Sequence, residues 1–216
     1  KNGHSSIGLQ TAFFFFFFNV GADIEYTDGF LFEFQDNPDQ FSFTQGLHFD
    51  YDVKALVGAL YAQRDFELGS STTLDLGVRA EYTNYNYDNR ADTGRSGRFI
   101  RVDDRSDDFL TVTPKISLRH HLNDRSLIYI RAARGSRAPQ VTDLYSVQLN
   151  QVAGEADVET LDSLEAGFKK DLGAAQFEFA AFTQWKDNFF FRNANGFNVV
   201  NGKTRHTGIE ASFSAD

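Results

Sequence analysis

The chain has 216 residues, a formal net charge of −9, three prolines, and neither cysteine nor methionine. The acidic balance argues against a general nucleic-acid binder, which would carry a basic face. The lack of cysteine excludes disulfides and thiolate metal sites. No stretch reaches the roughly 18 uninterrupted apolar residues that a transmembrane helix requires. Because the chain lacks an initiator methionine and the apolar core of a signal peptide, we expect an internal piece of a longer protein.

Apolar and polar residues alternate with a period of two along most of the chain, which is typical of strands with one apolar face. Leu76 and Val78 fall on one face, for example, whereas Asp75 and Arg79 fall on the other. The faces of two segments, Tyr51 to Leu68 and Ser126 to Arg134, are mixed, and no long segment shows helical periodicity. The pattern predicts nine strands, at about 7–17, 20–35, 52–68, 73–87, 109–122, 126–134, 160–171, 176–192 and 204–215.

The connections between these strands alternate between short and long. The short ones lie near 18–19, 68–71, 123–125 and 172–175, and the long polar ones near 36–51, 88–108, 135–159 and 193–203. Tight turns at one end and long loops at the other are typical of outer-membrane barrels, although a soluble meander can share them. The fold class predicted is therefore all-β, an antiparallel up-and-down transmembrane β-barrel segment.

Strand length and aromatic placement favour the membrane interpretation. Several predicted strands exceed the roughly 9–11 residues that cross a bilayer. Tyr82 and Trp185 lie near strand ends, as in an interfacial girdle. Two alternatives stay open. One is a small non-transporting barrel, structural or adhesive, and the other is a soluble β-sandwich binding module with Val78 and Ile116 in a dry core.

Three motifs in the second half resemble those of TonB-dependent outer-membrane receptors. The first is Tyr129-Ile130-Arg131-Ala132-Ala133-Arg134-Gly135-Ser136-Arg137-Ala138-Pro139 with Asp143-Leu144-Tyr145, which is similar to the family's ARGFRAP…ELY stretch. The second is Glu159-Thr160-Leu161-Asp162-Ser163-Leu164-Glu165-Ala166-Gly167-Phe168-Lys169, which is similar to PETSDSYELGLK. The third joins Lys186-Asp187-Asn188 to Asn201-Gly202-Lys203-Thr204-Arg205-His206-Thr207-Gly208-Ile209-Glu210. The first half resembles the family only in its general alternation of apolar and polar residues.

The resemblance implies a barrel of about 22 strands whose lumen holds a plug. Such receptors lie in the outer membrane of Gram-negative bacteria and import scarce nutrients, most often ferric siderophores. The inner-membrane TonB complex supplies the energy through the plug. Residues 1–216 would then form a partial barrel domain, with the plug and the closing strands outside this chain. The implied partners are outer-membrane lipid and lipopolysaccharide, TonB and a metal chelate, with no cofactor and no enzymatic activity.

Candidate ligand contacts lie in the long loops. Arg98, Arg101 and Arg105 carry planar guanidinium groups that suit the oxygens of an anionic chelate, although lipopolysaccharide phosphates or plain solubility would also account for them. Tyr145 and Gln148 are expected to line the entrance vestibule. Pro139 is expected to fix the exit of a strand from the wall, with Arg137 paired inside the wall or at the loop base.

No metal site is expected. Asp103, Asp104, Asp107 and Asp108 crowd one loop, but their spacing is not that of a calcium loop and arginines compete for them. His120 and His121 are adjacent and so face opposite sides of a strand. His206 and Glu210 would lie about 13 Å apart along a strand.

Two features of the strands themselves remain. The charged face is predicted to carry cross-strand ion pairs or to contact a plug. Its members are Glu25, Arg79, Glu81, Lys115, Arg119, Glu165 and Glu210. The run Phe13 to Phe18 places rings on both faces of a strand, which a barrel wall does not require, and we assign it no function.

Overall fold

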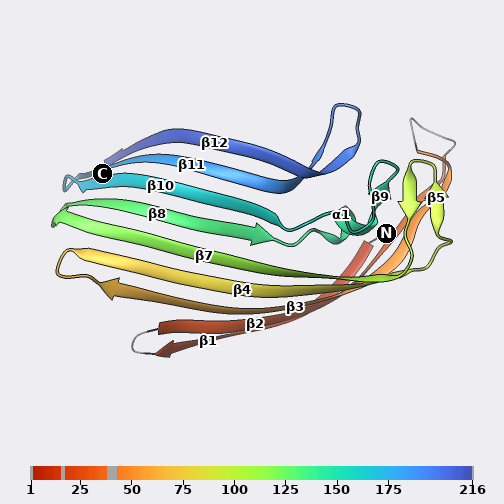
Figure 1. The fold of residues 1–216 in the computed structure, drawn as a ribbon, viewed down its shortest axis with the longest axis horizontal. Helices are drawn as coiled ribbons and strands as arrows, with labels where there is room; N and C mark the ends of the chain where they lie inside the picture. The colour runs from red at the N-terminus through yellow and green to blue at the C-terminus, as the bar shows by residue number, and fades with distance from the viewer. Residues whose placement is uncertain (1, 16–17, 38–42, 216) are drawn as a thin grey trace.

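A computed structural model of the chain describes residues 2–15, 18–37 and 43–215. Nine long antiparallel strands form one sheet in chain order, so each strand pairs with its neighbours along the sequence (Figure 1). This arrangement confirms the predicted all-β, up-and-down segment. The strands are β1 (Asn2–Phe15), β2 (Phe18–Gln35), β3 (Gly46–Glu67), β4 (Thr72–Asn89), β7 (Arg105–Asn123), β8 (Ser126–Arg137), β10 (Glu159–Asp171), β11 (Ala175–Arg192) and β12 (Asn198–Ala215).

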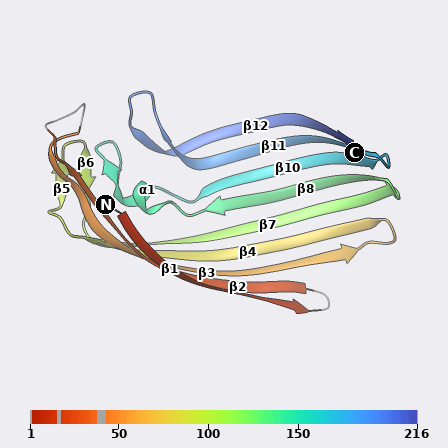
Figure 2. The same cartoon turned by 180° about the vertical axis from the view of Figure 1, so that it is seen from behind.

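The remaining elements lie at one end of this sheet, where the long connections gather (Figure 2). Three short strands, β5 (Gly94–Ser96), β6 (Phe99–Arg101) and β9 (Val147–Gln148), form a separate small sheet. One helical turn, α1 (Val141–Tyr145), precedes β9. The sequence pattern did not predict these four elements, because two to five residues are too few to show a period. The short turns lie at the opposite end.

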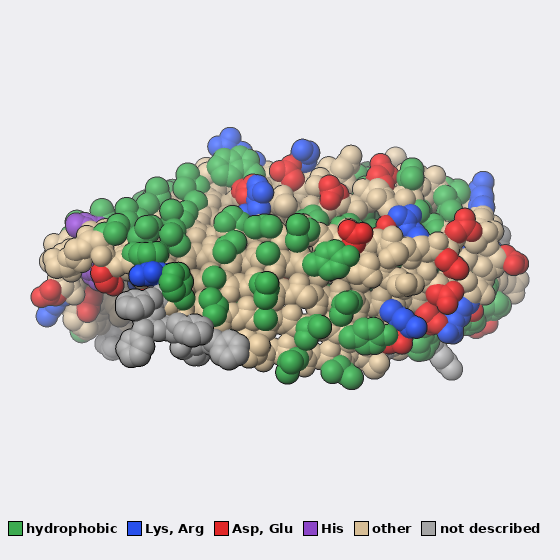
Figure 3. Space-filling view, turned by 60° about the horizontal axis from the view of Figure 1, so that its bottom comes forward, with side chains coloured by type: hydrophobic (Ala, Val, Ile, Leu, Met, Phe, Trp, Pro, Cys, Tyr) green, Lys and Arg blue, Asp and Glu red, His purple; other side chains and the backbone are tan. Residues whose placement is uncertain are grey.

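One face of the large sheet is apolar from strand to strand, and we call it the apolar face. Register places Leu60 opposite Ala80 and Ala80 opposite Val112. These side chains are uncovered: Val78 and Ile116 are each 47% exposed. Figure 3 shows hydrophobic side chains gathered over a broad part of the surface. No second sheet among the described residues covers this face, whereas a soluble β-sandwich would bury it. Within the described part, no helix is long and apolar enough to cross a membrane.

The opposite face, the charged face, carries the predicted cross-strand ion pairs. Arg119 binds Asp75 at 2.9 Å, and Arg131 binds Glu165 at 3.1 Å. Arg79 reaches both Asp23 and Glu81. Lys115 instead donates to the Gln63 side chain at 2.7 Å, and Glu25 accepts from Thr27 at 3.3 Å. For Glu210 the described residues show no ion pair.

Two glycines of the recognised motifs allow aromatic rings to lie flat across the charged face. Gly167 lies directly opposite Tyr129 and Gly208 opposite Phe182. A Cβ atom at Gly167 would collide with the Tyr129 ring, and one at Gly208 would lie 2.8 Å from Phe182 Cζ. The Tyr129 hydroxyl then donates to Glu165 Oε1 at 3.0 Å. These motif residues therefore shape the wall.

Several predicted boundaries are corrected. Phe18 and Asn19 were expected in a turn but lie in β2, opposite Phe15 and Phe14. Strands also continue farther at the long-loop end, with β3 beginning at Gly46 rather than 52 and β7 at Arg105 rather than 109. Part of the phenylalanine run lies outside the described residues, as do positions 38–42 of the first long loop.

Candidate functional site

The small sheet joins two long loops above the charged face. Phe99 of β6 pairs with Gln148 of β9, and Ile100 pairs with Val147. The Leu149 amide continues the ladder by donating to the Arg98 carbonyl at 3.0 Å. The connection between β4 and β7 is thereby fixed to the connection between β8 and β10.

A third loop, between β11 and β12, is tied to the same sheet. The side-chain oxygen of Gln148 accepts a hydrogen bond from the Asn198 amide at 3.2 Å, and both residues are buried. Arg98 Nη2 donates to the Gly196 carbonyl at 2.8 Å. The Arg98 guanidinium also lies 5.5 Å from the ring centroids of Phe43 and Phe197. Arg98 and Gln148, both proposed from the sequence, therefore hold three loops together.

Beneath the small sheet lies a buried group of rings that we call the aromatic cluster. The rings of Tyr87 and Tyr145 stack with centroids 4.4 Å apart, and Tyr51 lies 5.0 Å from Tyr87. Phe49 and Phe99 meet edge-on at 5.1 Å. Phe49, Tyr51 and Tyr87 come from the strands, whereas Phe99 and Tyr145 come from the loops, so the loops pack onto the wall as a core.

The Tyr145 hydroxyl belongs to a small hydrogen-bonded group. Its side chain is fully buried, and its hydroxyl donates to Asp107 Oδ2 at 2.9 Å. Arg105 Nε donates to the same oxygen at 2.7 Å. Burial, and then the contact with Asp107, raise the pKa of the Tyr145 hydroxyl, so it stays a donor at neutral pH. The Arg105 guanidinium also lies against Gly154, whose φ is +77°.

The first recognised motif forms the exit from β8. Arg137 binds Glu159 Oε2 at 3.0 Å, and Lys186 binds the other oxygen of Glu159 at 2.9 Å. This clamp places Arg137 at the loop base, as expected. Ala138 is buried, and the Pro139 carbonyl accepts a hydrogen bond from the Tyr85 hydroxyl at 3.2 Å.

The short helix α1 begins with a side-chain cap. The Asp143 carboxylate accepts a hydrogen bond from the Gln140 amide at 3.2 Å. Burial of this carboxyl raises the pKa of Asp143 above its usual value, because the charged form loses water. Leu144 follows at 1% exposure, so this motif residue anchors the turn in the core.

The third motif surrounds an irregular stretch of β11. Asn188 has a φ of +58°, and its side-chain amide donates to the Val158 carbonyl at 3.2 Å. The pairing with β12 shifts on either side of Phe189, next to Asn188. Asn201 lies in β12 opposite this stretch, and Glu210 lies farther along β12, opposite Ala180. The conformation of Asn188 suits asparagine, which tolerates positive φ better than most residues.

This end of the molecule also carries unpaired polar atoms, exposed apolar side chains and the acidic loop. The Tyr87 hydroxyl and Arg101 Nε are buried and make no hydrogen bond within the described part of the chain. Leu149 and Val152 are exposed on the loop surface. Asp104 accepts from the Asn89 amide at 2.9 Å, so the acidic loop is internally bonded. No group of three or more potential ligands for a metal ion occurs among the described residues.

Comparison with known proteins identifies this architecture. A family model described as TonB dependent receptor-like, beta-barrel, matches residues 2–216. The chain belongs to the TonB-dependent receptor barrels. Proteins of this family lie in the outer membrane of Gram-negative bacteria. In barrels of this kind an apolar band meets lipid and the long loops lie on the outer side.

Solved receptors share this fold at low identity. The ferric-catecholate import receptor Fiu from E. coli K12 is 18% identical, with a TM-score of 0.62 over 100% of this chain and 35% of that one. The siderophore receptor PiuA from Acinetobacter baumannii is 16% identical, with a TM-score of 0.64 over 100% of this chain and 36% of that one. The copper transporter OprC is 13% identical, with a TM-score of 0.69 over 99% of this chain and 35% of that one. The chain thus spans about a third of these proteins. No curated protein matches it.

Proposed function

We propose that this chain is the central barrel segment of a receptor that imports an anionic metal chelate, such as a ferric siderophore. The observation that supports this most is the fastening of three long loops over the charged face, with Arg98 between Phe43 and Phe197. Such an arrangement is a preorganised outer surface of arginine and aromatic groups, which suits planar oxygen-bearing ligands.

In this proposal the five loop residues have two kinds of role. Arg105, Tyr145 and Gln148 hold the loops in place through their hydrogen bonds to Asp107 and Asn198, and so act on the ligand indirectly. Arg98, which also holds the β11–β12 loop through the Gly196 carbonyl, and Arg101 are the groups that would contact the chelate. The Arg101 Nε atom, which is without a protein partner in the described residues, makes this residue the first to test.

The proposed mechanism needs parts of the receptor that lie outside this chain. Further strands would complete a barrel of about 22, and a plug would fill its lumen against the charged face. Work done on the plug by the TonB complex would open the path to the periplasm. Outer-membrane lipid and lipopolysaccharide would surround the apolar face.

Uptake of labelled chelates by cells that express the intact receptor tests this function. The panel contains catecholate, hydroxamate and carboxylate chelates of iron, together with copper complexes. We expect one anionic chelate to enter only when TonB is present, and Arg101→Gln to raise the concentration needed for half-maximal uptake. Arg125→Gln is the matched control, because Arg125 is exposed in a short turn at the opposite end. Uptake that is equal without TonB, or equal in Arg101→Gln, contradicts the proposal.

A further inference from the structure

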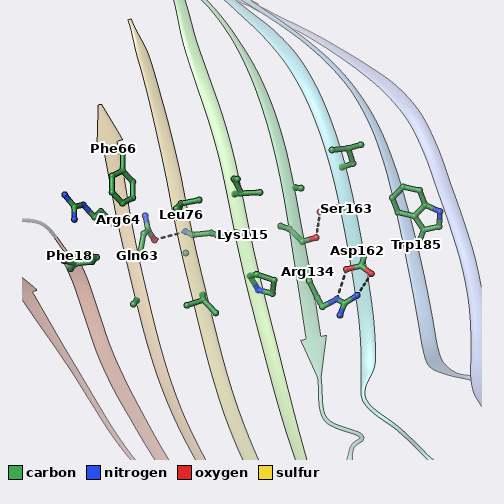
Figure 4. A pocket seen from close by; sticks show the side chains of 18 residues that line it. Phe18, Gln63, Arg64, Phe66, Leu76, Lys115, Arg134, Asp162, Ser163 and Trp185 are labelled. Atoms are coloured by element: carbon green, nitrogen blue, oxygen red, sulfur yellow. Dashed lines mark hydrogen bonds and ion pairs between the residues drawn. The ribbon is translucent and has the colours of Figure 1, made fainter. Parts of the chain in front are cut away.

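The ion pairs of this chain differ in the cation that they use. In the wall the cations are arginine and lysine, as where Arg134 donates twice to Asp162, at 2.7 and 2.6 Å (Figure 4). Both cations keep their proton at physiological pH, so such pairs do not respond to pH there. At the long-loop end one pair uses histidine, because His48 Nδ1 lies 3.1 Å from Glu33 Oε1. Histidine is the side chain that ordinarily changes charge between about pH 5 and 8.

A β-bulge turns His48 into the core of the loop end. The pairing of β2 with β3 shifts between Glu33 and Phe34, so that His48 has no residue opposite it in the ladder. Regular alternation would place His48 and Phe49 on opposite faces, yet they are exposed by only 2% and 1%. A bulge redirects a side chain in this way.

Both ring nitrogens of His48 face an acceptor. Nδ1 meets the Glu33 carboxylate, and Nε2 lies 2.7 Å from the Thr44 carbonyl oxygen. A neutral imidazole has one N–H, so it can donate to one acceptor and turns a lone pair toward the other. Both contacts are satisfied when the pair holds one additional proton, on the imidazole or on Glu33.

The other charged or titratable groups near His48 bind elsewhere. In the turn between β5 and β6, Arg98 lies over the Phe43 ring, 5.5 Å from its centroid, and donates to the β11–β12 loop. On β3 itself, Tyr51 bonds to a serine hydroxyl beside α1, and burial raises the pKa of Tyr51, so it stays neutral. Within the described residues, Glu33 is therefore the charged partner of the ring.

His48 holds the segment against which Arg98 lies. Its bond to the Thr44 carbonyl fixes the first long loop, between β2 and β3, next to the ring. The Thr44 side chain packs on Gly97, where a Cβ atom would lie 2.7 Å from Thr44 Oγ1. Phe43, the preceding residue, lies 6.0 Å from the His48 ring between centroids and carries Arg98 on its other contacts. Loss of the bond to Thr44 would therefore release Phe43 from Arg98.

We propose that His48 is a positioning residue of the outer surface, and that a proton shared with Glu33 holds the first long loop against Arg98. The hold weakens as the pH rises, because the closed arrangement binds one proton more than the open one. Arg98 would then bind an anionic chelate less tightly. This last step rests on the proposed function, whereas the hold on the loop does not.

Hydrogen exchange of the intact receptor in detergent, from about pH 5 to about pH 8, measures the hold. Exchange in residues 43–49, β5 and β6 is divided at each pH by that in Glu33→Gln, which cancels the intrinsic effect of pH on exchange. In this variant the amide can donate to Nδ1 of a neutral imidazole while Nε2 donates to Thr44, so the loop should stay closed at every pH. We expect the wild-type ratio to rise roughly 10-fold with pH, as for loss of one hydrogen bond to a charged group.

His121→Gln is the matched control. His121 is exposed in β7, at the end of the sheet that carries the short turns, so this variant should keep the wild-type response. His48→Leu removes both contacts and should exchange fast at every pH. Heat-resistant migration in gel electrophoresis establishes that each barrel is folded. A wild-type ratio that stays constant overturns the proposal, as does a response lost in His121→Gln or low-pH protection kept in His48→Leu.

Uptake separates this inference from the proposed function, with a ferric catecholate and a ferric carboxylate chelate as probes. We expect the concentration for half-maximal uptake to rise more with pH in the wild-type receptor than in Glu33→Gln, with the maximal rate unchanged. If exchange follows the expected pattern but neither probe enters through TonB, the hold on the loop stands and its link to chelate binding is overturned. If exchange does not follow that pattern, the inference is overturned whatever the uptake.

Discussion

The wall and the long-loop end of this chain are stabilised in opposite ways. In the wall, large apolar side chains such as Leu118 remain 38% exposed, and the backbone ladder with charged pairs on the other face holds the strands. At the long-loop end, Tyr87, Tyr145 and Leu144 are removed almost completely from solvent. The wall therefore leaves its apolar face uncovered by the described residues, whereas the loop end carries a core of the kind found in soluble domains.

This difference indicates that the two regions respond to different substitutions. Truncating a side chain should lower stability most where other protein atoms pack around that side chain. Introducing a charge should lower stability most where lipid would surround the side chain. Four experiments test the contrast, in order of decreasing effect.

Tyr145→Ala should have the largest effect, a local loss of about 3–5 kcal/mol, as for other buried aromatic truncations. It removes the stacking with Tyr87 and the hydrogen bond to Asp107. Hydrogen exchange should then rise in β6 and β9 while the wall remains protected. Tyr82→Ala, at a residue that is 46% exposed on the apolar face, is the control and should leave the loops protected. Unchanged exchange in Tyr145→Ala would show that the loops do not depend on this core.

Leu118→Arg should cost roughly 2–4 kcal/mol if its position lies near the bilayer midplane. Reversible unfolding in lipid vesicles measures this cost. Thr113→Asp places a charge on the other face, opposite Arg79, and should change stability by under about 0.5 kcal/mol. Equal effects of the two substitutions would contradict the assignment of the faces.

Gly154→Ala and Gly196→Ala distinguish the effect of a steric collision of the new Cβ atom from the effect of backbone strain. Both residues have positive φ, +77° and +78°, and each substitution should cost about 1–2 kcal/mol for that reason. A Cβ atom at Gly154 also collides with the Arg105 guanidinium, whereas at Gly196 nothing lies within 4 Å. Protease cleavage of the loops should therefore increase more in Gly154→Ala. A larger increase in Gly196→Ala would show that Arg105 moves aside freely.

The smallest predicted effect is the dependence of the stability of α1 on pH. Since the pKa of Asp143 is raised by burial, the folded loop binds this proton more tightly than the unfolded loop does. The resulting stabilisation is complete below the usual pKa of 3.8 and is lost as the pH rises through the folded value. Protection of α1, measured by exchange relative to Asp143→Asn at each pH, should decrease over that interval. A ratio of exchange rates between the two proteins that stays constant with pH would mean that Asp143 titrates as it does in the unfolded chain.

The sequence predicted the wall better than the loop end, for a physical reason. Strands with one apolar and one polar face show a period of two, so Leu76 and Val78 were placed correctly. The faces of β3 were mixed in the sequence because Phe49, Tyr51 and Val53 pack into the aromatic cluster, while the other side carries exposed apolar residues such as Leu60.

The candidate site was predicted only in part. The recognised motif contains Arg137, Leu144 and Tyr145. Arg137 pairs with Glu159, whereas Tyr145, which was expected to line the entrance vestibule, is fully buried together with Leu144. The partners of Arg98 and Gln148 could not be predicted, because they lie in other loops. Contacts such as that between Gln148 and Asn198 join residues far apart in the sequence and leave no local pattern.

The pairing of Phe99 with Gln148 also bears on the order of folding. Wall hairpins that close a short turn, such as β3 with β4, have local contacts that can form early. The small sheet requires β7 and β8, which lie between its partners in the sequence, to be in place first. Contacts of such long separation form slowly, because loop closure precedes any gain. The outer surface should therefore mature last, after the strands have entered the bilayer.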